Sequence, residues 1–211
     1  MKTQTPITID GDLSDWNLDE LTAIPYEKCW PGSERDRKEF SGRFYTRWDD
    51  QKLYFAAVIN DSTPVANGKD RVFWTDDNIM FTLYPWTWHM GEALNSGYYR
   101  EHIGPIQGGK ASISRNGYVA GGPGTAEGAE IVVKRTATGW IYEWSYPRAS
   151  LHPLALQKGQ GFRIAMSVFD QTKLDKKTEE DWGSFTWLTV AGFNTNVNAR
   201  PDLWRQFVFV E

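Results

Sequence analysis

The chain has 211 residues, of which 40% are hydrophobic, and a formal net charge of −4 with both signs interspersed. This length suits one large domain, and the lack of a basic run excludes the electrostatic signature of nucleic-acid binding. No apolar stretch reaches the ~20 residues that a membrane-spanning helix needs, so we expect no membrane partner. Eleven tryptophans exceed the needs of a core of this size. We therefore expect some of them at a surface or in a pocket.

Apolar and polar residues alternate along much of the chain, and helical periodicity is scarce. A short helical turn is expected near 18–21, capped by Ser14. Residues 43–48 alternate, an acidic turn follows at 49–52, and the continuous apolar run 53–59 is typical of a strand covered on both faces. The two segments predict a hairpin.

The remaining segments continue this β pattern. Further strands are expected at 79–83, 111–114, 130–135, 140–146, 162–169, 185–190 and 204–210, and one more helical turn near 149–156. The glycine-rich stretches 104–109 and 117–128 are expected to be loops or long hairpin ends. About ten strands between polar breaks predict an all-β antiparallel sandwich, immunoglobulin-like or of the jelly-roll type. We expect long loops, little helix and a single domain over 1–211, because no linker interrupts the chain.

Three segments occur in an order that indicates a family resemblance. They are an aspartate–glycine turn leading to a tryptophan (IDGDLSDW, 9–16), the buried strand LYFAAV (53–58) and the tryptophan-led strand WTDDNI (74–79). In this order they resemble the family 9 carbohydrate-binding modules and the related DOMON-like extracellular sugar-binding domains. The resemblance implies a β-sandwich that binds an oligo- or polysaccharide without catalysis.

The resemblance also implies where the sugar lies, between two aromatic faces. Trp74 matches the first of these faces. The second belongs to the loop before the last strand, where Phe193 is the aromatic residue, and two polar positions of the family fall at Met80 and near Ala165. Three asparagines of that loop are candidate hydrogen-bond partners: Asn194, Asn196 and Asn198.

An aromatic insertion follows the third segment. Trp86 and Trp88 are two residues apart, so in an extended segment they share a face and form a stacking platform, or else they fill the insertion's own small core. Tyr98, Arg100 and His102 are candidate polar contacts to the same ligand.

Three other functions stay open. A polysaccharide-active enzyme could use Tyr98 or Tyr99 with His102 for acid–base elimination, while Arg100 neutralises a uronate. A haem-binding domain would need axial ligands such as Met80 and His102. A structural accessory domain would need no ligand.

Structural calcium is the cofactor that the resemblance implies, and we expect no other. Hard oxygen ligands are offered by Asp49, Asp50, Asp61 and Asp77, although paired aspartates also occur as plain turn residues. We expect a monomer outside the cytoplasm, either extracellular or periplasmic. We expect either that a signal peptide was removed or that the domain was excised. We expect it to be a domain of a larger carbohydrate-active protein.

Overall fold

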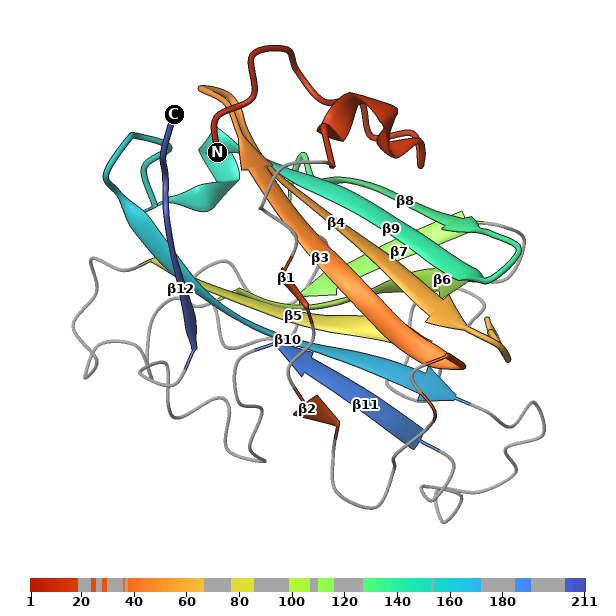
Figure 1. Ribbon diagram of the computed structural model, residues 1–211. Helices are drawn as coiled ribbons and strands as arrows, with labels where there is room; N and C mark the ends of the chain where they lie inside the picture. The colour runs from red at the N-terminus through yellow and green to blue at the C-terminus, as the bar shows by residue number, and fades with distance from the viewer. Residues whose placement is uncertain are drawn as a thin grey trace.

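The computed structural model describes residues 1–18, 24–25, 28–29, 36, 38–66, 77–85, 99–106, 110–115, 127–152, 154–171, 185–190 and 204–211. Two antiparallel sheets face each other in these ranges (Figure 1). The first sheet has five strands in the order β1-β3-β4-β9-β8. Their bounds are β1 Ile24–Pro25, β3 Phe40–Trp48, β4 Lys52–Asp61, β8 Glu130–Arg135 and β9 Gly139–Pro147.

The second sheet has seven strands, ordered β2-β11-β10-β5-β6-β7, with β12 also paired to β10. Their bounds are β2 Lys28–Cys29, β5 Asn78–Pro85, β6 Tyr99–Ile106, β7 Lys110–Arg115, β10 Gly161–Gln171, β11 Phe185–Val190 and β12 Arg205–Val208. Helix in the described ranges is limited to the 3-10 turns η1 (Leu13–Trp16) and η2 (Arg148–Leu151). The prediction of an all-β antiparallel sandwich with little helix is confirmed. None of these helices is long and apolar enough to cross a membrane.

Two local predictions need correction. The first helical turn is η1, and its cap is the Asp12 carboxylate, which accepts a hydrogen bond from Ser14 N at 3.0 Å; residues 19–21 lie outside the described ranges. Of the two forms expected for the stretch 104–109, the loop is wrong for Gly104, because this residue pairs with Ser112 near the end of the β6–β7 hairpin. Backbone pairing to an adjacent strand outweighs the low strand propensity of a single glycine.

Large aromatic side chains fill the space between the sheets. Phe55 of β4 lies 4.8 Å, between ring centroids, from Phe81 of β5 and 5.4 Å from Trp144 of β9. A polar link crosses the same core, since the Tyr146 hydroxyl donates a hydrogen bond to the carboxylate of Glu101, which is fully buried. The core therefore holds both sheets as one rigid scaffold.

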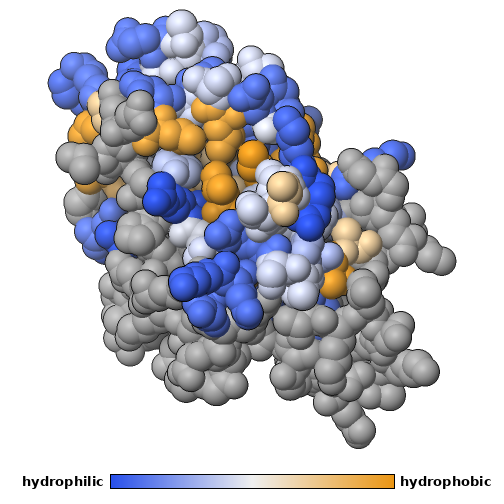
Figure 2. Space-filling view, turned by 45° about the vertical axis from the view of Figure 1, so that its right-hand side comes forward, coloured by the Kyte–Doolittle hydropathy of each residue, from blue (hydrophilic) through white to orange (hydrophobic). Residues whose placement is uncertain are grey.

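The outer face of the first sheet is partly covered by the N-terminal segment. Trp16 and Leu13 pack with Tyr45, Tyr54 and other residues in a second, smaller hydrophobic cluster. Figure 2 shows hydrophobic surface gathered in the upper part of the face in view, with hydrophilic residues beside it.

Glu143 of β9 holds the N-terminal turn against this face. Its carboxylate is fully buried and accepts hydrogen bonds from Gly11 N (2.7 Å), Asp10 N (3.0 Å) and Trp16 Nε1 (2.7 Å). Gly11 has a φ of +78°, and a Cβ there would lie 3.0 Å from the Lys134 side chain. The aspartate–glycine turn and the tryptophan that follows it are thus explained by one buried acceptor.

Candidate functional site

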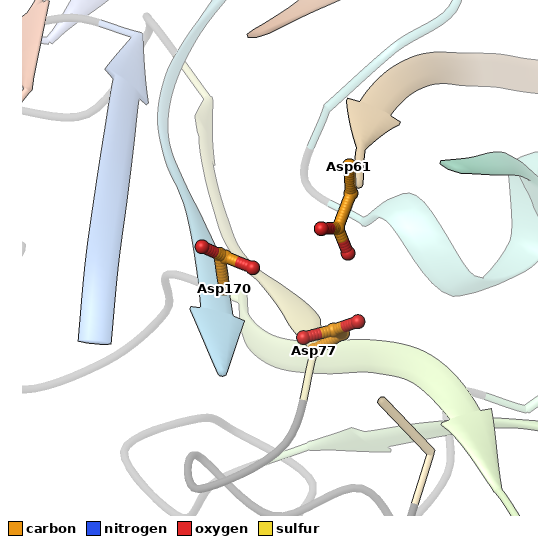
Figure 3. A group of neighbouring side chains, drawn as sticks. All are labelled: Asp61, Asp77 and Asp170. Carbon is orange, nitrogen blue, oxygen red and sulfur yellow. The ribbon is translucent and has the colours of Figure 1, made fainter. Parts of the chain in front are cut away.

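Three aspartates from both sheets meet at one end of the sandwich. Asp61 ends β4, Asp77 immediately precedes β5, and Asp170 lies near the end of β10. Their carboxylates point toward one another (Figure 3), with one oxygen from each within 4.8 Å of the others. All three side chains are at most 2% exposed. We call these residues the acidic cluster.

Asp77 is the anchor of the acidic cluster. Its Oδ2 accepts hydrogen bonds from Val65 N (2.5 Å) and Trp140 Nε1 (3.1 Å), and its Oδ1 accepts one from Gln171 N at 2.9 Å. These donors belong to segments that follow or form β4, β9 and β10. Asp77 therefore ties the start of β5 to both sheets.

The electrostatics of the acidic cluster favour a cation. Burial is the main cause that raises the pKa of Asp77 well above its usual range, and the negative charge of Asp61 is the next. A bound divalent cation would offset both effects, and carboxylate oxygens are the ligands that calcium prefers. The carboxylate oxygens of the acidic cluster thus form a set of ligands that fits a hard cation.

The four predicted calcium ligands do not lie together. Asp61 and Asp77 join the acidic cluster, whereas Asp49 and Asp50 lie in the β3–β4 turn, about 30 Å away along β4. Asp49 acts as a turn residue: Oδ1 accepts from Gln51 N at 2.7 Å, and Oδ2 accepts from the Tyr54 hydroxyl at 2.7 Å. The exposed Asp50 forms an ion pair with Lys2. The third member of the acidic cluster, Asp170, was missed by the sequence reasoning.

Two positions that are polar in the resembled family, and that are Met80 and Ala165 here, lie on the outer face of the second sheet. Met80 of β5 lies directly opposite Ser167 of β10 on one side and His102 of β6 on the other. Ala165 is on the same face, opposite Thr82. Met80 and Ala165 therefore neighbour each other diagonally on adjacent strands, as contacts to a single ligand require.

His102 is the predicted polar contact whose side chain is described. It is 6% exposed, and its Nδ1 lies 3.3 Å from the Asn78 amide oxygen. Because Met80 and His102 are direct cross-strand partners, they stand side by side and do not oppose each other across a haem. That geometry contradicts the axial pair that the haem interpretation needed. Arg100 lies opposite Thr82 in β6, and its side chain is not among those described.

The tryptophans divide into two groups. Five of them have described side chains, and each is at most 8% exposed. These five are Trp16, Trp48, Trp140, Trp144 and Trp204. These five side chains serve packing. An indole that stacks on a ligand would therefore belong to one of the tryptophans whose side chains are not described. The remaining predicted sugar contacts lie outside the described residues: Trp74, Trp86, Trp88, Tyr98, Phe193, Asn194, Asn196 and Asn198.

Comparison with known proteins defines the class of fold. Over nearly its whole length, this chain is similar to a family 9 carbohydrate-binding module from Caldicellulosiruptor kristjanssonii solved in complex with cellotriose. The identity is 13%, the match covers 98% of this chain and 90% of that chain, and the TM-score is 0.67. A structure with the same description in complex with glucose has 12% identity, 99% and 94% coverage and a TM-score of 0.65. The chain thus shares the β-sandwich fold of these two structures.

The sequence points to the same family. Residues 9–82 match the family described as carbohydrate family 9 binding domain-like. This stretch contains the turn docked on Glu143, the β3–β4 hairpin and the segment from Trp74 into β5. The resemblance to family 9 carbohydrate-binding modules is therefore confirmed. No curated protein matches the chain.

Proposed function

We propose that this protein is a non-catalytic carbohydrate-binding domain that holds a saccharide by aromatic stacking and polar contacts. The observation that carries the proposal is the agreement between the family match over 9–82 and the similarity in fold to modules solved with cellotriose and glucose. The rigid two-sheet core supports it, because a pre-formed scaffold loses little conformational freedom on binding.

The stacking group in this proposal is Trp74, three residues before the anchor Asp77. An indole offers a flat apolar surface with a negative face, which suits the C–H face of a sugar ring. Trp86, Trp88 or Phe193 supplies the second wall. The polar partners are drawn from five residues: Arg100, His102, Asn194, Asn196 and Asn198. Met80 and Ala165 supply no charge to the floor of such a site, which favours a neutral sugar there.

The expected affinity is weak. One stacked hexose unit of about twelve heavy atoms, at about −0.3 to −0.5 kcal/mol per atom, contributes about −4 to −6 kcal/mol to the binding of a glycan. This free energy corresponds to dissociation constants from about 1 mM to about 40 µM. Isothermal titration against a panel of neutral oligosaccharides, cellotriose first, should detect this binding. A folded protein that responds to no glycan would remove the proposal.

Structural calcium at the acidic cluster forms the second part of the proposal. The convergence of three buried carboxylates supports it, together with the raised pKa of Asp77 that a cation would lower. The cation would fix the start of β5 and thus the base of the segment that carries Trp74. We further propose that the domain works as a monomer outside the cytoplasm, as part of a larger carbohydrate-active protein.

Calcium is expected to stabilise the fold and EDTA to remove this gain. At a free concentration 100 times its dissociation constant, calcium adds about 2.7 kcal/mol, or about 5–10 °C in Tm for a chain of this size. Differential scanning calorimetry of dialysed protein with and without 1 mM calcium measures the shift. Asp170→Asn should abolish most of it, whereas Asp49→Asn should keep it. A wild-type Tm that ignores both calcium and EDTA would contradict the calcium site.

A further inference from the structure

Residues 1–18, the described part of the N-terminal segment, leave part of the first sheet's outer face uncovered. A groove of about 560 Å³ lies next to Leu18, over the ends of β3 and β4 that are nearest Asp61. Its lining residues are Leu18, Ser41, Gly42, Arg43, Tyr45, Val58 and Asn60. This volume falls within the range of about 300–1,000 Å³ that small-molecule sites occupy.

The strand register places the polar groups of the groove beside one another. Ser41 of β3 lies directly opposite Asn60 of β4, and Arg43 lies opposite Val58. Alternate residues of a strand point to the same face. Phe44 and Ile59 belong to the hydrophobic core on the other face. The four paired side chains and Tyr45 therefore share the outer face.

The described part of the chain makes no hydrogen bond or ion pair with these polar groups. Within the described ranges, no hydrogen bond or ion pair involves the side chains of Ser41, Arg43 or Asn60, or the Tyr45 hydroxyl. Arg43 is exposed and is the charged residue of the lining, in a chain with a net charge of −4. A guanidinium offers a planar fork of N–H donors that matches a carboxylate. The groove thus places the Arg43 guanidinium, which can bind a carboxylate, beside several groups that can bind hydroxyls.

We propose that this groove is a second glycan site, which takes an acidic saccharide with a hexuronate unit. The uronate carboxylate binds the Arg43 guanidinium. The ring hydroxyls bind Ser41, Asn60 and the Tyr45 hydroxyl, while Val58 lies under the apolar C–H face. The inference rests on the proposed saccharide-binding function, but it concerns the first sheet, whereas Trp74 leads into the second.

The test is a titration of ¹⁵N-labelled protein followed by backbone amide shifts, with a galacturonic acid trisaccharide and with cellotriose. We expect the acidic trisaccharide to shift amides of residues 41–45 and 58–60, and salt to weaken its binding. Arg43→Gln should weaken it about tenfold, because a hydrogen bond to a charged group contributes about 1.5–3 kcal/mol. Lys158→Gln removes the same charge from an exposed side chain outside the groove and should leave the affinity unchanged. Cellotriose affinity should be the same in all three proteins.

The outcomes separate the two proposals. Cellotriose binding without shifts at 41–45 and 58–60 from the acidic trisaccharide overturns the second site and leaves the proposed function standing. Acidic-trisaccharide binding that Arg43→Gln weakens, without cellotriose binding, supports the second site and counts against the proposed neutral-sugar site. An equal response to inorganic phosphate or acetate would show a simple anion site and would overturn the saccharide assignment. If neither sugar binds, both proposals fail.

Discussion

Glu143→Ala is expected to lower the free energy of unfolding by about 3 kcal/mol, because buried donors left without an acceptor cost about 1–3 kcal/mol each. Three N–H groups would lose their acceptor, from Asp10, Gly11 and Trp16. The gain from removing a buried carboxylate offsets part of this loss. Urea denaturation followed by tryptophan fluorescence measures the change.

The matched control is Glu130→Ala. Glu130 pairs with Lys52 at 2.7 Å on the surface, with about half of its side chain exposed, so its loss should cost less than about 1 kcal/mol. Equal effects of the two substitutions would show that Glu143 does not hold the N-terminal turn.

The pH dependence gives a second readout for Glu143. Burial raises the pKa of Glu143 above its ordinary value of 4.5, and its three hydrogen bonds oppose this only in part. In the pH range between 4.5 and that raised value, the native state therefore binds more protons than the unfolded state, and this group adds stability as pH falls. The stability difference between the wild type and Glu143→Ala should grow as pH is lowered from 7 toward 5. A difference that shrinks over this range would contradict the sign.

Asp77→Ala is expected to have a comparable effect on stability and an additional effect on binding. It leaves Val65 N, Gln171 N and Trp140 Nε1 without their acceptor in a buried site, at a cost of about 3 kcal/mol. It also frees the start of β5, three residues after Trp74, so we expect weaker saccharide binding even below the melting temperature. Calorimetric melting and isothermal titration at 10 °C measure the two effects.

Asp50→Ala serves as the control for Asp77→Ala. Asp50 is an exposed aspartate that pairs with Lys2, and we expect a change below about 1 kcal/mol and unaltered binding. Wild-type saccharide affinity in a folded Asp77→Ala protein would show that the acidic cluster does not position the binding segment.

The sequence predicted the strands well wherever one face is buried. The run 53–59 became β4 with its inward residues in the core, and the turn at Asp49 is held by the local hydrogen bonds that an acidic turn suggests. The β6 strand was missed, because Gly104 and Pro105 disfavour a strand locally and only the pairing with β7 overrides them. Long-range pairing of this kind leaves no local pattern.

The site was predicted only in part, for a similar reason. Asp61 and Asp77 were candidates for the calcium site that the resemblance implies, but Asp170 joins them only because β10 lies next to β5 in the sheet. A charged residue between the aromatic residues of the strand 140–146 was the available signal for Glu143. The pattern marks such a residue as buried and bound, yet cannot say which backbone turn it holds.

The central claim is that a rigid sandwich presents Trp74 to a saccharide. Isothermal titration of cellotriose into the wild type and Trp74→Ala tests it most directly, with melting curves to confirm that both are folded. We predict a dissociation constant between about 40 µM and 1 mM for the wild type and at least a tenfold loss in the variant. Equal affinity of the two folded proteins, or no heat from either, would contradict it.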